Sequence, residues 1–258
     1  MTIWLIGGTS ESRTIAQCLT QEGLPWLVTV VSPTAARLYQ GLPGQVQPGK
    51  LDLAGMQALA QQHGIRAIVD ASHPFATEIS KQAMALGLPY LRFERQAYSL
   101  EPPAESVPDL ETLLKPQYLE NRRVLLTLGI KALHRFQPWQ QRAYLWARIL
   151  PTAKAQAIQM GFAPEQLICD RAPTDALAEQ TLWQKLGVDI VITKASGGPG
   201  GVPIKLAAAK ALGIKLLVIA RPTLDYPQQT HNLERVIEFC LLATNGKPLS
   251  IQTKPEHT

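Results

Sequence analysis

The sequence predicts an α/β protein of two Rossmann-like parallel-sheet domains with the active-site cleft between them. Short apolar and β-branched runs alternate with helical stretches along the chain. Most of these runs are apolar at nearly every position, as in parallel strands that are covered on both faces. The pattern of the first half also returns in the second half. The chain of 258 residues, 46% of them apolar and 17% charged, is long enough to bury a core without disulfide or metal crosslinks.

The first half is predicted to contain four strands and three helices, and the second half five strands and four helices. The expected strands are Ile3–Ile6, Leu27–Val31, Ala67–Val69, Tyr90–Phe93, Val124–Leu128, Tyr144–Ile149, Leu167–Cys169, Asp189–Thr193 and Lys215–Ala220. The expected helices are Ser10–Gln21, Leu53–Gln62, Thr77–Leu86, Thr152–Met160, Thr174–Leu186, Ile204–Leu212 and Leu233–Leu242. Between the halves lies the proline-rich stretch Tyr98–Pro116, which is typical of a linker.

An internal similarity supports two related halves. Gly64-Ile65 precedes one apolar strand as Gly187-Val188 precedes another, and the motif Ala85-Leu86-Gly87 returns as Ala211-Leu212-Gly213. Chance similarity between two βαβ units remains an alternative explanation. We expect an N-terminal Rossmann-like nucleotide-binding domain at residues 1–115, a C-terminal Rossmann-like domain at 116–245 and a loose polar tail at 246–258.

Composition limits the classes of function. The three cysteines lie far apart and form no zinc or disulfide pattern, which indicates reduced thiols in the cytoplasm. No apolar run is long enough to span a membrane. The net charge of +5 favours an anionic ligand, although a solvated surface explains it equally well. No nucleic-acid partner is expected, because there is no lysine or arginine run longer than two and no basic-aromatic stripe.

The turn after the first strand is the first candidate site. Glycines allow a backbone to approach a phosphate, and a helix start offers unpaired N–H groups. The motif is not G-x-G-x-x-G, so a tight turn without a ligand is the alternative. The residues expected to bind a cofactor here are Gly7, Gly8, Thr9, Ser10, Ser12 and Arg13.

The end of the second strand indicates which nicotinamide nucleotide is preferred. A site for NAD usually has Asp or Glu at this point, to bind the ribose 2′-hydroxyl. This chain has Ser32-Pro33-Thr34, followed by Arg37, and a hydroxyl with a nearby cation suits a 2′-phosphate. We therefore expect NADPH in the N-terminal domain, with Ser32 and Arg37 as further cofactor-binding residues.

Two loops that follow buried strands complete the candidate site. Asp70-Ala71-Ser72-His73 leaves the third strand, where Ser72 is a cofactor candidate and His73 a proton carrier. The second loop, Thr193–Gly201, is rich in glycine and suits a phosphate or a carboxylate. From it and the following helix we select Lys194 as a catalytic cation, Ser196 and Gly197 for the cofactor, and Gly200, Gly201 and Lys205 for the substrate.

Arginines at strand ends favour an acidic substrate, because a guanidinium binds a carboxylate with two hydrogen bonds. The substrate-binding candidates are Arg95, Arg148 and Arg221, and Asp170 is a further candidate proton donor. No histidine spacing indicates a metal site. Two common enzyme signatures, Tyr-x-x-x-Lys and G-x-S-x-G, are also absent.

Three motifs together resemble the precorrin-6A reductase family, including its cobalt-precorrin-6A members. They are Gly7–Arg13, Asp70–Ala76, and Thr193–Gly197 with Arg221-Pro222, and the resemblance covers roughly residues 1–242. It departs at Ser10, where the family usually has glycine, and at Ala172-Pro173-Thr174, where the family tends to have Gly-Pro-Phe. The resemblance implies two Rossmann-like domains that hold NADPH and a tetrapyrrole in the cleft between them, and hydride transfer to one carbon of a macrocycle double bond.

Two other functions remain open at this stage. One is another NADP-dependent reductase or epimerase with an acidic substrate, and the other is an NADP-sensing regulatory module. A sensor would have no need for the second glycine-rich loop. The sequence leaves the oligomeric state open, a monomer included.

Overall fold

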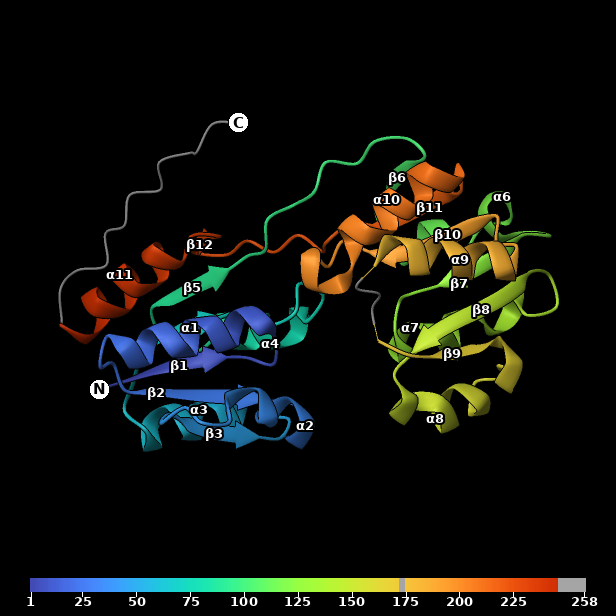
Figure 1. Cartoon of the computed structure of the whole chain (residues 1–258). Helices are drawn as coiled ribbons and strands as arrows, with labels where there is room; N and C mark the ends of the chain where they lie inside the picture. The colour runs from blue at the N-terminus through green and yellow to red at the C-terminus, as the bar shows by residue number, and fades with distance from the viewer. Residues whose placement is uncertain (172–174, 246–258) are drawn as a thin grey trace. The chain divides into compact units, whose positions relative to one another are not determined.

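The computed structural model describes residues 1–171 and 175–245, which form two compact units. Unit 1 combines Met1–Gln96 with the residues from Thr223 onward, and unit 2 is Ala97–Pro222. Figure 1 traces these segments by colour. The predicted tail at 246–258 lies outside the described residues. So does Thr174, the expected first residue of one helix.

Unit 1 contains a parallel sheet of six strands in the order β12-β5-β4-β1-β2-β3. Read from β3, this is the Rossmann strand order 3-2-1-4-5-6, with β12 in the place of the sixth strand. The strands are β1 (Thr2–Ile6), β2 (Trp26–Val30), β3 (Gln45–Pro48), β4 (Ile65–Asp70), β5 (Tyr90–Phe93) and β12 (Gln229–Thr230). The helices are α1 (Ser10–Gln21), α2 (Pro33–Ala36), α3 (Leu53–Gln62), α4 (Thr77–Met84) and α11 (Leu233–Thr244).

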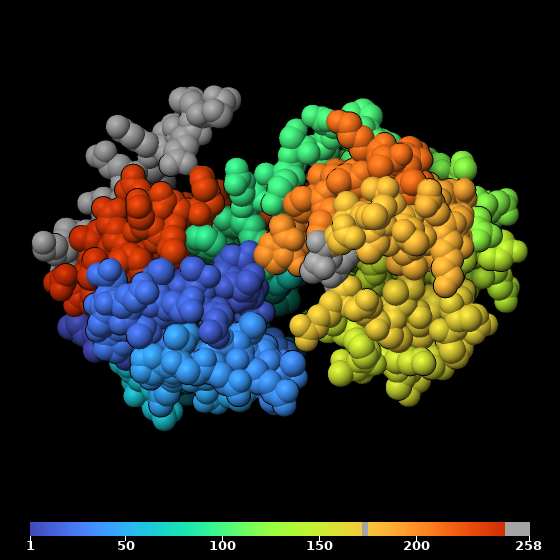
Figure 2. Space-filling view, in the orientation of Figure 1, coloured from blue at the N-terminus to red at the C-terminus, as the bar shows by residue number. Residues whose placement is uncertain are grey.

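Helices cover both faces of this sheet. Alternate residues of β1 are therefore buried in two separate core clusters, one on each face. Ile3 and Leu5 belong to a core cluster that includes apolar residues of α1 and α11. Trp4 and Ile6 belong to the opposite cluster, with residues of α3 and α4. Figure 2 shows α11 in red against α1 in blue, so segments far apart in the sequence form one body.

Unit 2 repeats the same order in its own parallel sheet, β6-β11-β10-β7-β8-β9. Here β7 takes the central place, and β10 and β11 take the places of β4 and β5. The strands are β6 (Ala104–Val107), β7 (Arg123–Leu126), β8 (Tyr144–Ile149), β9 (Leu167–Cys169), β10 (Ile190–Lys194) and β11 (Lys215–Ile219). The helices are α5 (Leu110–Leu113), α6 (Pro116–Leu119), α7 (Ile130–Leu133), α8 (Lys154–Gln159), α9 (Ala176–Leu186) and α10 (Val202–Leu212).

The internal similarity found in the sequence falls on equivalent places of the two sheets. Gly64 and Gly187 precede β4 and β10, and Gly87 and Gly213 precede β5 and β11. In unit 2, α9 and α10 pack together over one core cluster that includes Trp183. The two units are therefore alike in topology as well as in local pattern.

The units are divided differently from the boundaries expected at residues 115 and 116. The stretch that we expected to be a linker, Tyr98–Pro116, contains β6 and α5, and β6 pairs in parallel with β11 of unit 2. The last helix, α11, was expected in the C-terminal domain but belongs to unit 1. The reason is that β6 and β12 are short and polar strands, without the apolar runs on which the prediction relied.

The described ranges, 1–171 and 175–245, contain neither a membrane-spanning helix nor a metal-binding cluster. No helix there combines the length and the hydropathy that a membrane-spanning helix needs. No cluster of three or more His, Cys, Asp or Glu side chains in residues 1–171 and 175–245 is placed to hold a metal ion.

Candidate functional site

The β1–α1 turn of unit 1 lies at the carboxyl end of the central strand, where the strand order reverses. Ligands of Rossmann-like sheets bind at this place. A Cβ atom on Gly7 would lie 2.2 Å from the Tyr39 hydroxyl and 2.5 Å from Val28 Cγ2, so only glycine fits. Gly8 has a φ of +98°, a conformation that L side chains rarely adopt. The backbone can therefore approach a ligand here without an intervening side chain.

Thr9 and Ser12 stabilise this turn from within. Thr9 is the N-cap of α1: its hydroxyl accepts the Ser12 N–H at 3.1 Å, and its own N–H donates to Ser12 Oγ at 3.0 Å. Thr9 Oγ1 also donates to the Ala71 carbonyl at 2.8 Å, which joins the turn to the end of β4. Both side chains are buried. They were expected to bind the cofactor, and the structure places them as the residues that hold the loop in shape.

The start of α1 offers hydrogen-bond donors to a diphosphate, and its one acidic side chain, Glu11, is neutralised by an arginine. The N–H groups of Ser10 and Glu11 stand in the first turn, where the helix provides no acceptor. Glu11 accepts two hydrogen bonds from Arg95, at 2.6 and 2.9 Å, so its negative charge is compensated. Arg13 donates to the Leu38 carbonyl. These features fit a dinucleotide pyrophosphate, and the pairing with Glu11 places Arg95 beside the start of α1.

The β2–α2 turn borders the glycine turn. Ser32 is the N-cap of α2, and its hydroxyl accepts the Ala35 N–H at 3.2 Å. Ala35 Cβ lies 3.9 Å from the position of a Cβ atom on Gly8. Arg37 follows and is exposed to solvent. A hydroxyl and a cation therefore lie next to the proposed pyrophosphate position, where the ribose of a dinucleotide would follow.

A buried ion pair organises the end of β4. Asp70 and Arg92 are 0% and 1% exposed, and Asp70 Oδ1 lies 3.0 Å from Arg92 Nη1. Asp70 Oδ2 accepts hydrogen bonds from Ser80 at 2.5 Å and from Tyr90 at 2.6 Å. Burial and the adjacent Asp70 charge raise the pKa of Tyr90, so its phenol keeps its proton and donates it to this carboxylate.

The same pair holds the loop that contains the candidate proton carrier. Arg92 donates to the Ser72 hydroxyl at 3.1 Å and to the Ser72 carbonyl at 3.0 Å, and Asp70 accepts the Ser72 N–H at 2.9 Å. His73 follows and is exposed, with Nδ1 accepting the Phe75 N–H at 3.2 Å. In the neutral ring the proton therefore resides on Nε2.

In unit 2, Lys194 ends β10 at the equivalent place in the sheet. Burial, and next the positive charge of Lys131, lower the pKa of Lys194. Lys131 belongs to α7, which follows the central strand β7. The positive charge of Lys131 therefore acts on Lys194 at the place where the strand order of unit 2 reverses. The Ser196 N–H donates to the Lys194 carbonyl at 2.7 Å, which curls the loop immediately after the strand.

The glycine-rich loop after β10 is shaped by close packing. A Cβ atom on Gly200 would lie 1.9 Å from Ser196 Oγ, and Gly197 and Gly201 have φ values of +80° and +70°. Lys205 is 2% exposed and donates from Nζ to the Gly200 carbonyl at 2.7 Å. Lys205 was expected to bind the substrate, and in the structure its ammonium group supports the loop through the Gly200 carbonyl.

The remaining candidates of unit 2 belong to the ends of three different strands, β8, β9 and β11. Arg148 is buried, and its guanidinium makes two hydrogen bonds of 2.8 Å with Glu179. Asp170 follows the edge strand β9, three strand spacings from β10, or roughly 14 Å. This separation keeps Asp170 away from Lys194. Arg221 lies after β11, and its Nε donates to the Ala195 carbonyl at 2.7 Å.

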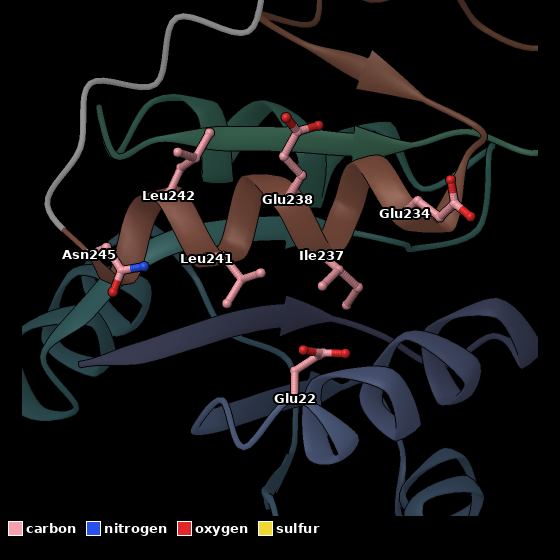
Figure 3. A pocket seen from close by; sticks show the side chains of 7 residues that line it. All are labelled: Glu22, Glu234, Ile237, Glu238, Leu241, Leu242 and Asn245. Carbon is pink, nitrogen blue, oxygen red and sulfur yellow. The ribbon is translucent and has the colours of Figure 1, made fainter.

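A hollow of about 600 Å³ lies on α11 in unit 1, and Figure 3 shows the side chains that line it. Its apolar part is formed by Ile237, Leu241 and Leu242. Glu22, Glu234 and Glu238 also line it. Three carboxylates disfavour a phosphate or a polycarboxylate, so this hollow belongs to neither ligand considered above.

Sequence reasoning missed three residues of these sites. Tyr39 lies under the glycine turn, Glu11 pairs with Arg95, and Lys131 faces Lys194. No motif surrounds Tyr39 or Lys131. Glu11 lies within the Gly7–Arg13 motif, but only the folded chain shows that it pairs with Arg95.

Together, these features define a two-domain α/β protein of the dinucleotide-binding class. The sequence profile of the family described as precorrin-6x reductase CbiJ/CobK matches residues 2–241. The chain belongs to this family. It is an oxidoreductase of cobalamin biosynthesis that acts on a CH–CH group, which implies a nicotinamide cofactor.

Individual relatives cover almost the whole chain. The cobalt-precorrin-6A reductase of Synechocystis is 41% identical, over 93% of this chain and 95% of the relative. The cobalt-precorrin-6A reductase of Priestia megaterium is 32% identical, over 95% of this chain and 100% of the relative. A solved structure, CobK precorrin-6A reductase, aligns with a TM-score of 0.75 at 23% identity over 96% of this chain and 98% of that one, so the two share a fold.

Proposed function

We propose that this protein reduces the macrocycle of cobalt-precorrin-6A with NADPH. The observation that carries the proposal is the 41% identity, over nearly the full length, to a relative named cobalt-precorrin-6A reductase. A precorrin-6A reductase from Rhodococcus erythropolis is less similar, at 32% identity over 88% of this chain. The higher identity to the cobalt-precorrin-6A reductase favours the cobalt-containing substrate over the metal-free one. The family match also favours an enzyme over a regulatory module.

NADPH is preferred to NADH in this proposal because of the β2–α2 turn. No acidic side chain stands between Val31 and Arg37, so nothing would repel a 2′-phosphate or pair with a 2′-hydroxyl as Asp does. Ser32 offers its hydroxyl and Arg37 its exposed guanidinium. The N–H groups of Ser10 and Glu11 would hold the pyrophosphate, and the lack of side chains at Gly7 and Gly8 would let it approach.

When bound, the cofactor supplies a hydride to one carbon of a macrocycle double bond. The protein stabilises the electron density that the conjugated ring then gains, and Lys194 is the cation that we assign to this role. The ring must also receive a proton, and we assign its delivery to His73 Nε2, since Nδ1 accepts the Phe75 N–H. Because Asp170 follows β9, the edge strand three places from β10, we do not assign it the proton.

The test is steady-state oxidation of NADPH by the purified full chain, with cobalt-precorrin-6A and with metal-free precorrin-6A. We expect turnover with both reactants present, and a higher kcat/KM for the cobalt form. The Lys194→Ala variant should retain its NADPH dissociation constant and lose activity by about a hundredfold or more. Lys210→Ala, at an exposed lysine of α10, is the matched control. Absence of turnover by the wild type with either tetrapyrrole would contradict the proposal.

A further inference from the structure

A hollow of about 260 Å³ opens in unit 2 at the carboxyl end of β11, and of its lining residues only Gly197 and Arg221 were candidates from the sequence. Val218 on β11, Ala220 just after it and Val202 at the start of α10 form part of its walls. Ala195 and Gly197 contribute the loop that follows β10, and Leu100 comes from the segment that enters the unit. Most of this surface is hydrocarbon.

Two side chains give the hollow its chemistry. Arg221 lines it, and the hydrogen bond from its Nε to the Ala195 carbonyl holds the guanidinium in one orientation. Tyr98 also lines it and is 44% exposed, which is unusual for a large aromatic side chain. The Tyr98 hydroxyl would lie 3.1 Å from a Cβ atom on Gly198, so the ring reaches across to the glycine-rich loop.

This combination selects a flat ligand with apolar substituents and at least one carboxylate. Apolar walls accept methyl and ring carbon atoms, an aromatic face stacks on a conjugated ring, and a guanidinium pairs with a carboxylate. The amide of nicotinamide and the amine of adenine would enter hydrocarbon walls without partners, which costs free energy. Pockets that enclose a whole drug-sized ligand hold about 300–1,000 Å³, so this one admits only part of a macrocycle.

We propose that the hollow receives one substituted pyrrole edge of the tetrapyrrole, with Tyr98 against the ring and Arg221 paired with a carboxylate arm. This inference rests on the proposed function and adds a subsite to it. It assigns Val202, Val218 and Ala220 to substrate specificity, which no motif in the sequence indicates.

The experiment fills the hollow and measures binding of the two ligands separately. The Ala220→Leu variant should raise the dissociation constant of cobalt-precorrin-6A, titrated by its absorbance without NADPH, by about tenfold or more. Its NADPH dissociation constant, from a fluorescence titration, should stay unchanged. Ala207→Leu introduces the same side chain at an exposed position of α10 and should change neither constant.

Further variants test the chemistry of the rim. Tyr98→Phe keeps the aromatic face and should bind the tetrapyrrole normally, whereas Tyr98→Ala should bind it about tenfold more weakly. Arg221→Met should weaken tetrapyrrole binding and reduce its dependence on salt, because one ion pair is lost. If Ala220→Leu does not fold, as judged by circular dichroism, Ala195→Val fills the same hollow from the loop side.

The outcomes separate this inference from the proposed function. A folded Ala220→Leu variant with normal tetrapyrrole binding overturns the subsite and leaves the function intact. A raised dissociation constant for NADPH alone would assign the hollow to the nucleotide and also overturn the subsite. A wild-type protein that binds no tetrapyrrole overturns both.

Discussion

Tyr39 supports the glycine turn between β1 and α1 of unit 1 directly. Its hydroxyl accepts the Gly8 N–H at 2.9 Å and lies 2.6 Å from Ser12 Oγ. Ser12 donates its own hydrogen to the Thr9 carbonyl at 2.7 Å, so the phenol proton goes to Ser12 Oγ. Burial raises the pKa of Tyr39, and the phenol therefore stays protonated at neutral pH.

We expect Tyr39→Phe to lower the free energy of unfolding of the chain by about 1 kcal/mol, because one hydrogen-bonding partner of the turn is removed. The NADPH dissociation constant should rise by about threefold to tenfold, since the Gly8 backbone loses its support. Urea unfolding and fluorescence titration measure the two effects. Tyr144→Phe removes the same atom at a residue that is 67% exposed and should change neither quantity. Equal behaviour of the two variants would contradict the role of Tyr39.

Lys205 leads to a prediction about pH. Burial, and next the charge of Arg148, lower the pKa of Lys205 from 10.5 to about 8. Below the folded value the lysine is charged in both states, and its burial penalty is fully present. Between the folded pKa of about 8 and the unfolded pKa of 10.5, the unfolded chain binds the proton and the folded chain does not. The free energy of unfolding therefore rises with pH in this range. Above the unfolded value the penalty is gone.

The stability of the wild type relative to Lys205→Met should therefore rise by up to about 3 kcal/mol between about pH 7 and about pH 10. Other groups titrate alike in both proteins and cancel in the difference. Lys210→Met, at a lysine of the same helix that is 73% exposed, should show a flat difference. Thermal unfolding across this pH range is the measurement. A flat difference for Lys205→Met would mean that the folded protein keeps this lysine charged.

At the scale of elements, the β2–α2 turn allows the effect of a charge on nucleotide binding to be measured without loss of the helix. Asp and Asn are N-caps as good as Ser, so both can replace Ser32 without loss of α2. Ser32→Asp places a negative charge beside the proposed 2′-phosphate position and should raise the NADPH dissociation constant by about tenfold or more. NADH, which lacks that phosphate, should be affected less. Ser32→Asn is the uncharged control. Equal losses for both nucleotides would show that this turn does not read the 2′-phosphate.

The sequence predicted the longer helices and the apolar strands, and it missed short elements, including α7, whose Ala132 and Leu133 are buried. Ser10–Gln21 and Leu53–Gln62 were predicted with the bounds of α1 and α3, because Ile15, Ala16 and Leu19, for example, mark one helix face. The edge strand β3 reads Gln-Val-Gln-Pro and is largely exposed, so it carries no apolar signal. The loops of the candidate site were found for a related reason: each follows a central strand that is buried on both faces.

What the sequence could not provide was the state of each polar side chain within those loops. Arg148 and Arg95 have the same side chain at predicted strand ends, but one pairs with a buried glutamate and the other with Glu11 at a helix start. The partners lie 31 and 84 residues away in the sequence. Such pairings are properties of the tertiary structure, and no local pattern predicts them.

At the scale of the whole molecule, the two units exchange their sixth strands. After β5 the chain enters unit 2 and forms β6 beside β11, and after β11 it returns to unit 1 and forms β12 beside β5. The chain therefore crosses between the units twice, near Gln96 and near Pro222. A division into two consecutive halves, as the sequence predicted, cannot represent this topology.

The exchange predicts which fragments fold. Residues 97–222 contain all six strands of the second sheet in one continuous stretch, and we expect this fragment to unfold cooperatively in urea and to give dispersed amide resonances. Residues 116–245 lack β6, which leaves the edge of β11 unpaired. They also carry α11, whose Val236, Phe239 and Cys240 are 0% exposed in the whole chain, without the sheet that covers them. This second fragment should aggregate or unfold without cooperativity.

Residues 1–115 provide the complementary test, since they lack α11 and β12 and should also fail to fold alone. Adding residues 223–245 as a separate peptide should restore structure to residues 1–96, because that peptide carries the missing helix and edge strand. Circular dichroism and size-exclusion chromatography follow the recovery. If residues 116–245 unfolded as cooperatively as 97–222, the sixth strand would contribute little to its sheet, and the exchange would be an incidental feature of the chain's path. If only 97–222 folds, the exchange determines where the domains of this reductase begin and end.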